Sequence, residues 1–299
     1  MRTLVLTIAL LTLGSRAEAA VPRVAVSILP LHSLAAAVMK GVGEPELILP
    51  PGVSAHTYSM KPSDASKVAN ADILFWMGPS METFLLKAAA NLPAKAKNVE
   101  LMSIPSLILR PAREPLQDEP DARRPALGEN DLHAWLDPDN ALALAVAMAE
   151  TLAKADPDNT AKYGANLEVL AQELDALDGE IRKTLAPVRE RGFIAFHDAY
   201  LYFEGRYGLS IIGIVEPAPD RQPGATRVKI LKEALQSGRA RCLFTEPQFE
   251  PKLARMLVDG TKARTAELDP EGTKLNAGPD AYAALMRGMA KSIVDCLSR

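Results

Sequence analysis

Eight short apolar segments, arranged in two sets of four, constrain the fold of this chain more than any other feature. Each has the composition of a β-strand and is followed by a helix-like stretch, which is the pattern of βα units around a parallel sheet. The segments are 24–29, 46–50, 72–77 and 98–102 in the first set, and 192–196, 210–215, 241–245 and 265–268 in the second. No sequence repeat relates the two sets. We therefore predict an α/β fold of two lobes, each with a four-stranded parallel sheet flanked by helices.

A long amphipathic stretch separates the two sets. Its apolar residues recur at spacings of three and four, which places them on one face of a helix. They are Tyr163, Leu167, Leu170, Leu174, Leu177, Ile181, Leu185 and Val188. Residues 159–185 are enough for a helix about 40 Å long, and Pro157 and Pro187 mark its ends. We predict an N-terminal lobe at 20–156 and a C-terminal lobe at 188–299, joined by one long rigid helix at 157–187.

The first residues have the pattern of a secretory signal peptide. Arg2 precedes an apolar run at 4–13, and Ala17 and Ala19 form an A-x-A cleavage signal. The run covers about 15 Å as a helix, too little to cross a hydrocarbon core of about 30 Å. We predict that residues 1–19 are cleaved and that the mature protein is soluble and exported.

The charge balance and the cysteines exclude several classes. Lys and Arg number 34 against 37 Asp and Glu, so the chain lacks the basic surface that nucleic-acid binding requires. Cys242 and Cys296 are not in a CxxC pair, although they can form one bridge. Residues 111–130 are rich in proline and charge and contain neither histidine nor cysteine. We predict that this segment is an unstructured surface loop without a function of its own.

Three of the four histidines follow predicted strands. His56 follows the second strand, His133 follows the fourth, and His197 ends the fifth, while Asp269 closes the eighth. Ligands of open parallel sheets bind outside the carboxyl ends of the strands, so we expect two ligands from each lobe to meet in the cleft. Three imidazoles and one carboxylate suit Zn²⁺, whereas manganese or calcium recruits more oxygen atoms. His32, at the start of a predicted helix, is expected to be an ordinary surface or capping residue.

The segments that carry these residues resemble a known family. They are PPGVSAHTYSMKPSD at 50–64, DLHAWLDPDNA at 131–141, GFIAFHDAYLYFE at 192–204 and ELDPEGTKLNAGPDAY at 267–282. Together they are similar to the metal-binding solute-binding proteins of bacterial ABC importers, and in particular to the periplasmic zinc-binding, ZnuA-like branch. The resemblance covers essentially the whole mature chain.

The resemblance implies a function as well as a fold. It implies a periplasmic monomer, not an enzyme, that holds Zn²⁺ between two lobes and delivers it to a membrane permease driven by an ATPase. The implied ligands are His56, His133 and His197, with Asp269 as the fourth group or its near neighbour. Manganese-preferring relatives have a glutamate at the place of His197, which favours zinc.

Two further features bear on the match. Zinc-branch members often carry a histidine-rich acidic loop before the second ligand, whereas residues 111–130 contain no histidine, so we do not expect an auxiliary metal-collecting role. The pair Cys242 and Cys296 resembles the second-lobe disulfide of zinc-branch relatives, and an exported protein meets the oxidising conditions that such a bond requires.

Alternative functions use the same residues. A manganese or other divalent-metal importer subunit, or a secreted metal-binding adhesin, would share this site and differ in cargo or partner. A zinc hydrolase would need an open position for water and a general base. The sequence contains neither HExxH nor GxSxG, and Asp269 would close the open position. We therefore do not predict an enzyme.

Overall fold

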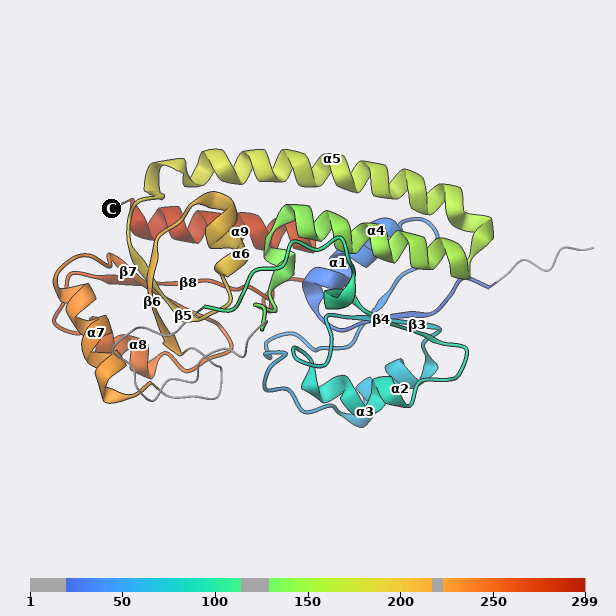
Figure 1. Ribbon diagram of the computed structural model, residues 1–299, viewed down its shortest axis with the longest axis horizontal. Coiled ribbons are helices and arrows are strands. Elements are labelled where there is room, and N and C mark those ends of the chain that lie inside the picture. Colours follow the sequence, from blue (N-terminus) through green and yellow to red (C-terminus); the bar gives the residue numbers. More distant parts are fainter. Residues whose placement is uncertain (1–19, 114–128, 217–222, 299) are drawn as a thin grey trace, which may run out of the picture.

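Two four-stranded parallel sheets form the framework of the molecule (Figure 1). The computed structural model describes residues 20–113, 129–216 and 223–298, so the predicted signal peptide lies outside it. The first sheet has the order β2-β1-β3-β4 and the second β6-β5-β7-β8, all pairs being parallel. The strands are β1 (Val24–Val26), β2 (Glu46–Leu47), β3 (Ile73–Trp76), β4 (Lys97–Glu100), β5 (Phe193–His197), β6 (Ile211–Glu216), β7 (Cys242–Thr245) and β8 (Arg264–Glu267).

The predicted strands are confirmed, with differences at their ends. The central strands β1, β3 and β5 are buried along their whole length, which is why their sequences are continuous apolar runs. The edge strand β4 exposes most of its residues, and the edge strand β8 exposes every second residue. Strand β2 is shorter than predicted, since Pro50 and Pro51 have no N–H group with which to continue the pairing.

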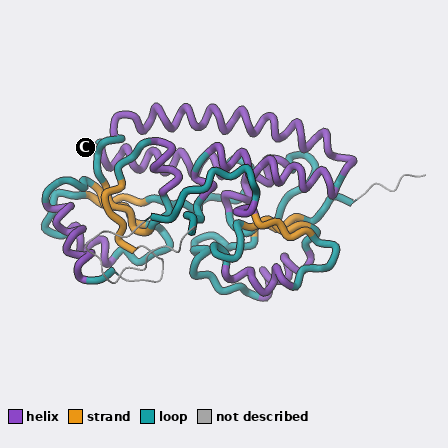
Figure 2. Tube along the Cα trace, viewed as in Figure 1, coloured by secondary structure: helices purple, strands orange, loops and turns teal. Residues whose placement is uncertain are grey.

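Helices cover both faces of each sheet (Figure 2). The helices above the sheets in Figure 1 are α1 (Leu29–Val38), α4 (Pro138–Ala155), α5 (Thr160–Leu185), α6 (Leu201–Tyr207) and α9 (Ala281–Leu297). Those below are α2 (Pro62–Asn70) and α3 (Leu86–Ala90) under the first sheet, and α7 (Ala225–Gln236) and α8 (Lys252–Val258) under the second. Short 3₁₀ turns lie at Thr83–Leu85, Leu101–Ser103, Ala134–Leu136, Pro157–Asn159 and Ala186–Val188. We call the first sheet with α1 to α4 the first lobe, and the second sheet with α6 to α9 the second lobe.

The hydrophobic core is continuous through the upper layer. One cluster includes β1 and β3 of the first sheet, β5 and β7 of the second, and the helices α1, α4, α5 and α9. Two smaller clusters lie below, one between the first sheet and α2 and α3, the other between the second sheet and α7 and α8. The lobes therefore share one core above the sheets and have separate cores beneath them.

Helix α5 contacts both lobes, as predicted for the linking helix. Its apolar face buries Tyr163, Leu170, Leu174, Leu177, Ile181 and Leu185, and the helix packs on α1 and α4 of the first lobe and on α6 and α9 of the second. The Tyr163 hydroxyl donates to the buried Asp156 carboxylate at 2.8 Å, which ties the first turn of the helix to the end of α4.

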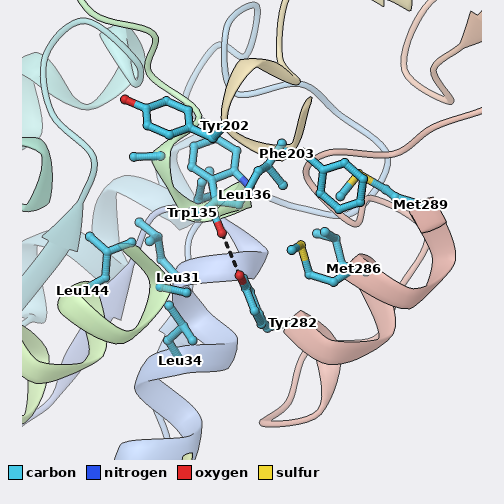
Figure 3. Close-up of a cluster of buried hydrophobic side chains, with 14 of the residues drawn as sticks. Leu31, Leu34, Trp135, Leu136, Leu144, Tyr202, Phe203, Tyr282, Met286 and Met289 are labelled. Atoms are coloured by element: carbon cyan, nitrogen blue, oxygen red, sulfur yellow. Dashed lines mark hydrogen bonds between the residues drawn. The ribbon is translucent and has the colours of Figure 1, made fainter. Parts of the chain in front are cut away.

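A cluster of buried side chains joins the lobes beneath α5 (Figure 3). Trp135 lies at its centre, fully buried, and the Tyr282 hydroxyl of α9 donates to the Trp135 carbonyl at 2.8 Å. The Trp135 indole N–H donates in turn to the Pro270 carbonyl at 2.9 Å. The 3₁₀ turn that follows His133 in the first lobe is therefore fixed by two hydrogen bonds to the second lobe.

The ends of the predicted loop at 111–130 are structured. Pro111 and Asn130 form an antiparallel bridge, and the Arg113 guanidinium pairs with Asp198 at 3.0 Å and Glu204 at 2.5 Å. The loop therefore begins against the second lobe, which its composition did not indicate. Residues 114–128 lie outside the described part of the chain.

A disulfide joins Cys242 of β7 to Cys296 of α9, as the family resemblance implied. It ties a central strand of the second sheet to a helix of the shared upper core and closes a loop with a sequence separation of 54. We expect the double variant Cys242→Ala/Cys296→Ala to lose up to about 4 kcal/mol of unfolding free energy, because its unfolded chain has more freedom. Urea unfolding of both metal-free proteins, with and without reductant, measures the change. Reductant should weaken only the wild type, and equal midpoints for the oxidised proteins would contradict the prediction.

A buried carboxylate in the first lobe connects the ends of β1 and β3. Glu82 accepts hydrogen bonds from the Ser27 hydroxyl at 2.6 Å and from the Met77 and Gly78 N–H groups at 3.0 and 2.9 Å. Burial raises the pKa of Glu82 from an ordinary value of 4.5 to about 7, although these hydrogen bonds act in the opposite direction. The folded protein consequently binds this proton more tightly than the unfolded chain does.

The raised pKa of Glu82 predicts a loss of stability between pH 4.5 and pH 7. The stabilisation is fully present below the unfolded pKa and disappears as the pH rises through the folded one. Relative to Glu82→Gln, which has no proton to lose, the wild type should lose about 3 kcal/mol across this window. Urea unfolding of both metal-free proteins at several pH values measures the difference. A difference that does not vary with pH would show that Glu82 keeps its ordinary pKa.

Candidate metal site

Three histidines bring their Nε2 atoms together at the boundary between the lobes. The His133 Nε2 atom lies 3.3 Å from that of His56 and 3.4 Å from that of His197, and the three candidate ligand atoms are all within 4.8 Å of one another. Two nitrogens bound to one tetrahedral zinc ion at the usual bond length lie about 3.3 Å apart. The spacing of the imidazoles therefore matches the ligand shell of a zinc ion.

Each histidine reaches this point from a different local structure. His197 is the last residue of β5 and is buried at the carboxyl end of the second sheet. His133 precedes the 3₁₀ turn Ala134–Leu136, and its N–H donates to the Asp131 carboxylate at 2.8 Å. His56 lies in the loop after β2 and is half-buried, and its N–H donates to the Ser54 hydroxyl at 3.3 Å.

Carboxylates orient two of the three rings. Asp131 Oδ1 lies 3.2 Å from His133 Nδ1, and Glu246 Oε1 lies 2.6 Å from His197 Nδ1. The Tyr200 hydroxyl donates to the same Glu246 oxygen at 2.8 Å. Carboxylates at Nδ1 favour the tautomer with the proton on that atom, which leaves the Nε2 lone pair free for a metal ion and strengthens it as a ligand.

The electrostatics of the site differ between its histidines. Burial lowers the pKa of His56 well below its ordinary value, and the neighbouring His133 and His197 add to this effect. Burial also lowers the pKa of His197, but the charge and hydrogen bond of Glu246 outweigh it, so the net pKa is raised. His56 thus stays neutral to low pH, the state in which an imidazole binds a metal ion.

The structure does not place Asp269 within the same group of atoms. Among the described residues, this group consists of the three histidines alone, whose candidate ligand atoms lie within 4.8 Å of one another. Asp269 Oδ2 accepts from the Thr273 hydroxyl at 3.1 Å and from the Lys274 N–H at 3.3 Å. Asp269 Oδ1 is buried and has no hydrogen-bond partner in the described part of the chain. A buried carboxylate oxygen without a donor is suited to receive a cation.

Sequence reasoning missed three carboxylates beside the site. Asp131 lies two residues before His133, and Glu246 follows the seventh strand, so the rule that located the histidines also reaches Glu246. Glu271 is buried and accepts hydrogen bonds from Ser54 and Ala55 of the first lobe. Burial, with the added charges of Glu246 and Asp269, raises the pKa of Glu271 to about 8.

The fourth histidine lies apart from this group. His32 is buried in α1, and its Nε2 atom lies 2.9 Å from the Pro45 carbonyl oxygen. The expectation of a surface or capping role was wrong, because α1 packs against α4, α5 and α9 and buries most of its residues. His32 is a core residue with a structural contact.

Comparison with known proteins connects this geometry to a family. The family model described as the periplasmic component A of the zinc-uptake complex, ZnuA, matches residues 24–296. The chain belongs to the ZnuA family. It is 43% identical to the high-affinity zinc uptake system protein ZnuA of Brucella suis biovar 1, with 92% of each chain covered. It is 35% identical to the protein of that name from Paracoccus denitrificans, with 99% of this chain and 98% of the relative covered.

A solved structure of the family has the same fold. The crystal structure of a zinc-bound ZnuA deletion mutant superposes with a TM-score of 0.75 at 26% identity, and covers 93% of this chain and 98% of its own. ZnuA proteins are periplasmic transport components and not enzymes. In the described ranges, no helix combines the length and the hydropathy needed to cross a membrane.

The carboxylate of Glu246, which contacts His197 Nδ1, should control metal affinity in this member of the ZnuA family. We expect Glu246→Ala to weaken Zn²⁺ binding by about 10- to 100-fold, because His197 loses the group that orients its ring and strengthens its Nε2 atom. Competition with a chelator of known affinity measures the change. Glu180→Gln is the control, since Glu180 forms an exposed ion pair with Arg287 and should leave affinity unchanged. Unaltered affinity in Glu246→Ala would contradict the assigned role.

Proposed function

We propose that this chain captures Zn²⁺ between its two lobes in the periplasm and delivers it to the permease of an ABC importer, which an associated ATPase drives. The spacing of the Nε2 atoms carries this proposal, because the distances from His133 to His56 and to His197 match those of nitrogens on one tetrahedral zinc ion. The names of the relatives and the zinc-bound family structure support the choice of metal. Family membership supports the role in a multi-component uptake system.

In this proposal His56, His133 and His197 are the zinc ligands and Asp269 supplies the fourth. The unpartnered Asp269 Oδ1 supports this assignment, since Zn²⁺ accepts three nitrogens and one carboxylate oxygen. A carboxylate in the fourth position also leaves no open site at which the metal could activate water. A donor set of three imidazoles favours zinc over manganese, which prefers oxygen.

We also propose lobe boundaries at 20–156 and 188–299, with 157–187 as the linking helix and the protein acting as a monomer. The shared upper core supports a rigid molecule, because opening the lobes widely would expose apolar surface along α1, α5 and α9. Zinc binding then requires only a small rotation of the lobes, because the loops that carry His56 and His133 are already held by hydrogen bonds to the second lobe.

Calorimetric titration of metal-stripped protein with Zn²⁺ and, separately, with Mn²⁺ tests the proposal. We expect one tight zinc site whose affinity falls as the pH drops from 8 to 5, because each imidazole must be neutral to bind. Zinc at a thousandfold excess over Kd should stabilise the fold by about 4 kcal/mol, which raises Tm.

Two histidine variants make this test specific. His133→Ala should abolish the tight site and the rise in Tm, whereas His32→Gln, which changes a buried histidine in α1, should bind one zinc ion as the wild type does. Tighter binding of Mn²⁺ than Zn²⁺, or zinc affinity that does not vary with pH, would overturn the proposed cargo and its ligands.

A further inference from the structure

We propose that Glu271 is a positioning residue of the metal site, which holds the loop carrying His56 against the second lobe and so fixes the direction of its Nε2 atom. The proposal rests on the proposed function, because it assumes that His56 is a zinc ligand. Glu271 itself is not required to touch the ion.

The loop that carries His56 is attached to the second lobe. Strand β2 contains two residues, so the regular pairing of the first sheet ends well before His56. Beyond it, the Gly52 N–H donates to the Thr273 carbonyl at 3.1 Å, and the Ala55 N–H donates to Glu271 Oε2 at 3.1 Å. The Ser54 hydroxyl donates to Glu271 Oε1 at 3.3 Å. The loop thus belongs to the first lobe in sequence and is fastened to the second.

The connection continues from Glu271 to the backbone of His56. The Ser54 Oγ atom that donates to Glu271 also accepts from the His56 N–H at 3.3 Å. Ala55, the residue before His56, is bonded directly to Glu271. The Ser54 hydroxyl and the Ala55 N–H, which together position the backbone of His56, are therefore both bonded to the Glu271 carboxylate. The direction of the His56 imidazole follows from the position of this backbone.

The segment that contains Glu271 is itself fixed. Gly272 has φ +70°, a conformation that favours glycine, and a Cβ atom there would lie 2.8 Å from Leu29 Cδ2 of α1, so the segment packs tightly against the first lobe. The Pro270 carbonyl accepts from Trp135, two residues after His133. Residues 269–273 therefore contact the loops of both first-lobe histidines and contain the proposed fourth ligand.

Because Glu271 is buried, losing these hydrogen bonds would cost more free energy than losing them at the surface. The side chain is 2% exposed and borders a cavity of about 100 Å³, lined by Leu49 and Val53 from the first lobe and Leu275 from the second. A buried carboxylate is costly unless donors satisfy it, and here the donors come from the His56 loop. The cavity walls are apolar enough to accept a leucine at position 271.

Three variants of the full-length mature protein test the role. Glu271→Leu removes the acceptors and introduces an apolar side chain of similar size. Glu271→Gln keeps one carbonyl acceptor for Ala55, and Ser54→Ala removes the link to the His56 N–H. The readouts are the rate of Zn²⁺ transfer to a chelator and the visible absorption spectrum of bound Co²⁺, which reports coordination geometry. The Tm of each metal-free protein reports the fold.

We expect Glu271→Leu to release zinc at least tenfold faster and to change the Co²⁺ spectrum, in line with the effect of residues that orient metal ligands. Glu271→Gln should restore the spectrum and most of the rate. Ser54→Ala should release zinc severalfold faster, and this result decides the question if Glu271→Leu does not fold.

Glu82 provides a matched control. It is equally buried and also accepts from a serine hydroxyl and two backbone N–H groups, all within the first lobe. Glu82→Leu should lower Tm and leave the Co²⁺ spectrum unchanged. A wild-type spectrum and release rate in Glu271→Leu, or equal spectral changes in Glu82→Leu, would overturn the proposal. Failure of the wild type to bind zinc or cobalt would instead overturn the proposed function.

Discussion

The apolar core shared by the two lobes is the interaction on which the rest of the structure depends. Helices α1, α4, α5 and α9 pack into one cluster that includes the upper faces of both sheets. The site requires this, because His56 and His133 come from the first lobe and His197 from the second, while their Nε2 atoms must meet within a few tenths of an ångström of the zinc geometry. Close packing has the required precision, since a well-filled core resists displacements of that size.

Polar groups at the boundary make the placement specific. Arg206 of α6 pairs with Asp139 of α4 and Asp178 of α5 at 3.1 and 2.9 Å, and Trp135 donates across the boundary to Pro270. Such contacts contribute little to net stability, because each replaces a hydrogen bond to water. Sliding one lobe past the other would nevertheless leave buried donors and acceptors without partners. The apolar core keeps the lobes together, and the polar contacts select one arrangement.

The sequence predicted the parts of the structure that follow from periodicity and chain order. Strands buried on both faces appear as apolar runs, α5 has one apolar stripe, and His197 directly ends a strand. Glu246 follows the seventh strand, so the rule that located the histidines also reaches it. Nothing in the sequence signals the role of Glu271, because a carboxylate in a loop is usually exposed. Glu271 is covered by the loop that carries His56, which lies more than two hundred residues earlier in the sequence. His32 was misjudged for a related reason, since a helix enclosed by three others has no polar face to reveal its surroundings. The disulfide pairing came from the family resemblance, whereas zinc was indicated first by the three imidazoles and then by the resemblance.

The separate cores beneath the two sheets allow the outer surfaces of the lower helices to vary in sequence separately from the upper layer. Helices α2 and α3 rest on one small cluster, and α7 and α8 rest on another. Substitutions on the outer surfaces of these helices change the underside of the molecule without disturbing the layer that sets the Nε2 distances. The outer surfaces of these helices can therefore diverge while the geometry of the metal site stays the same. The residues buried in the cluster beneath the second sheet are more constrained, because Phe249 packs against that cluster and its ring centroid lies 5.7 Å from that of His197.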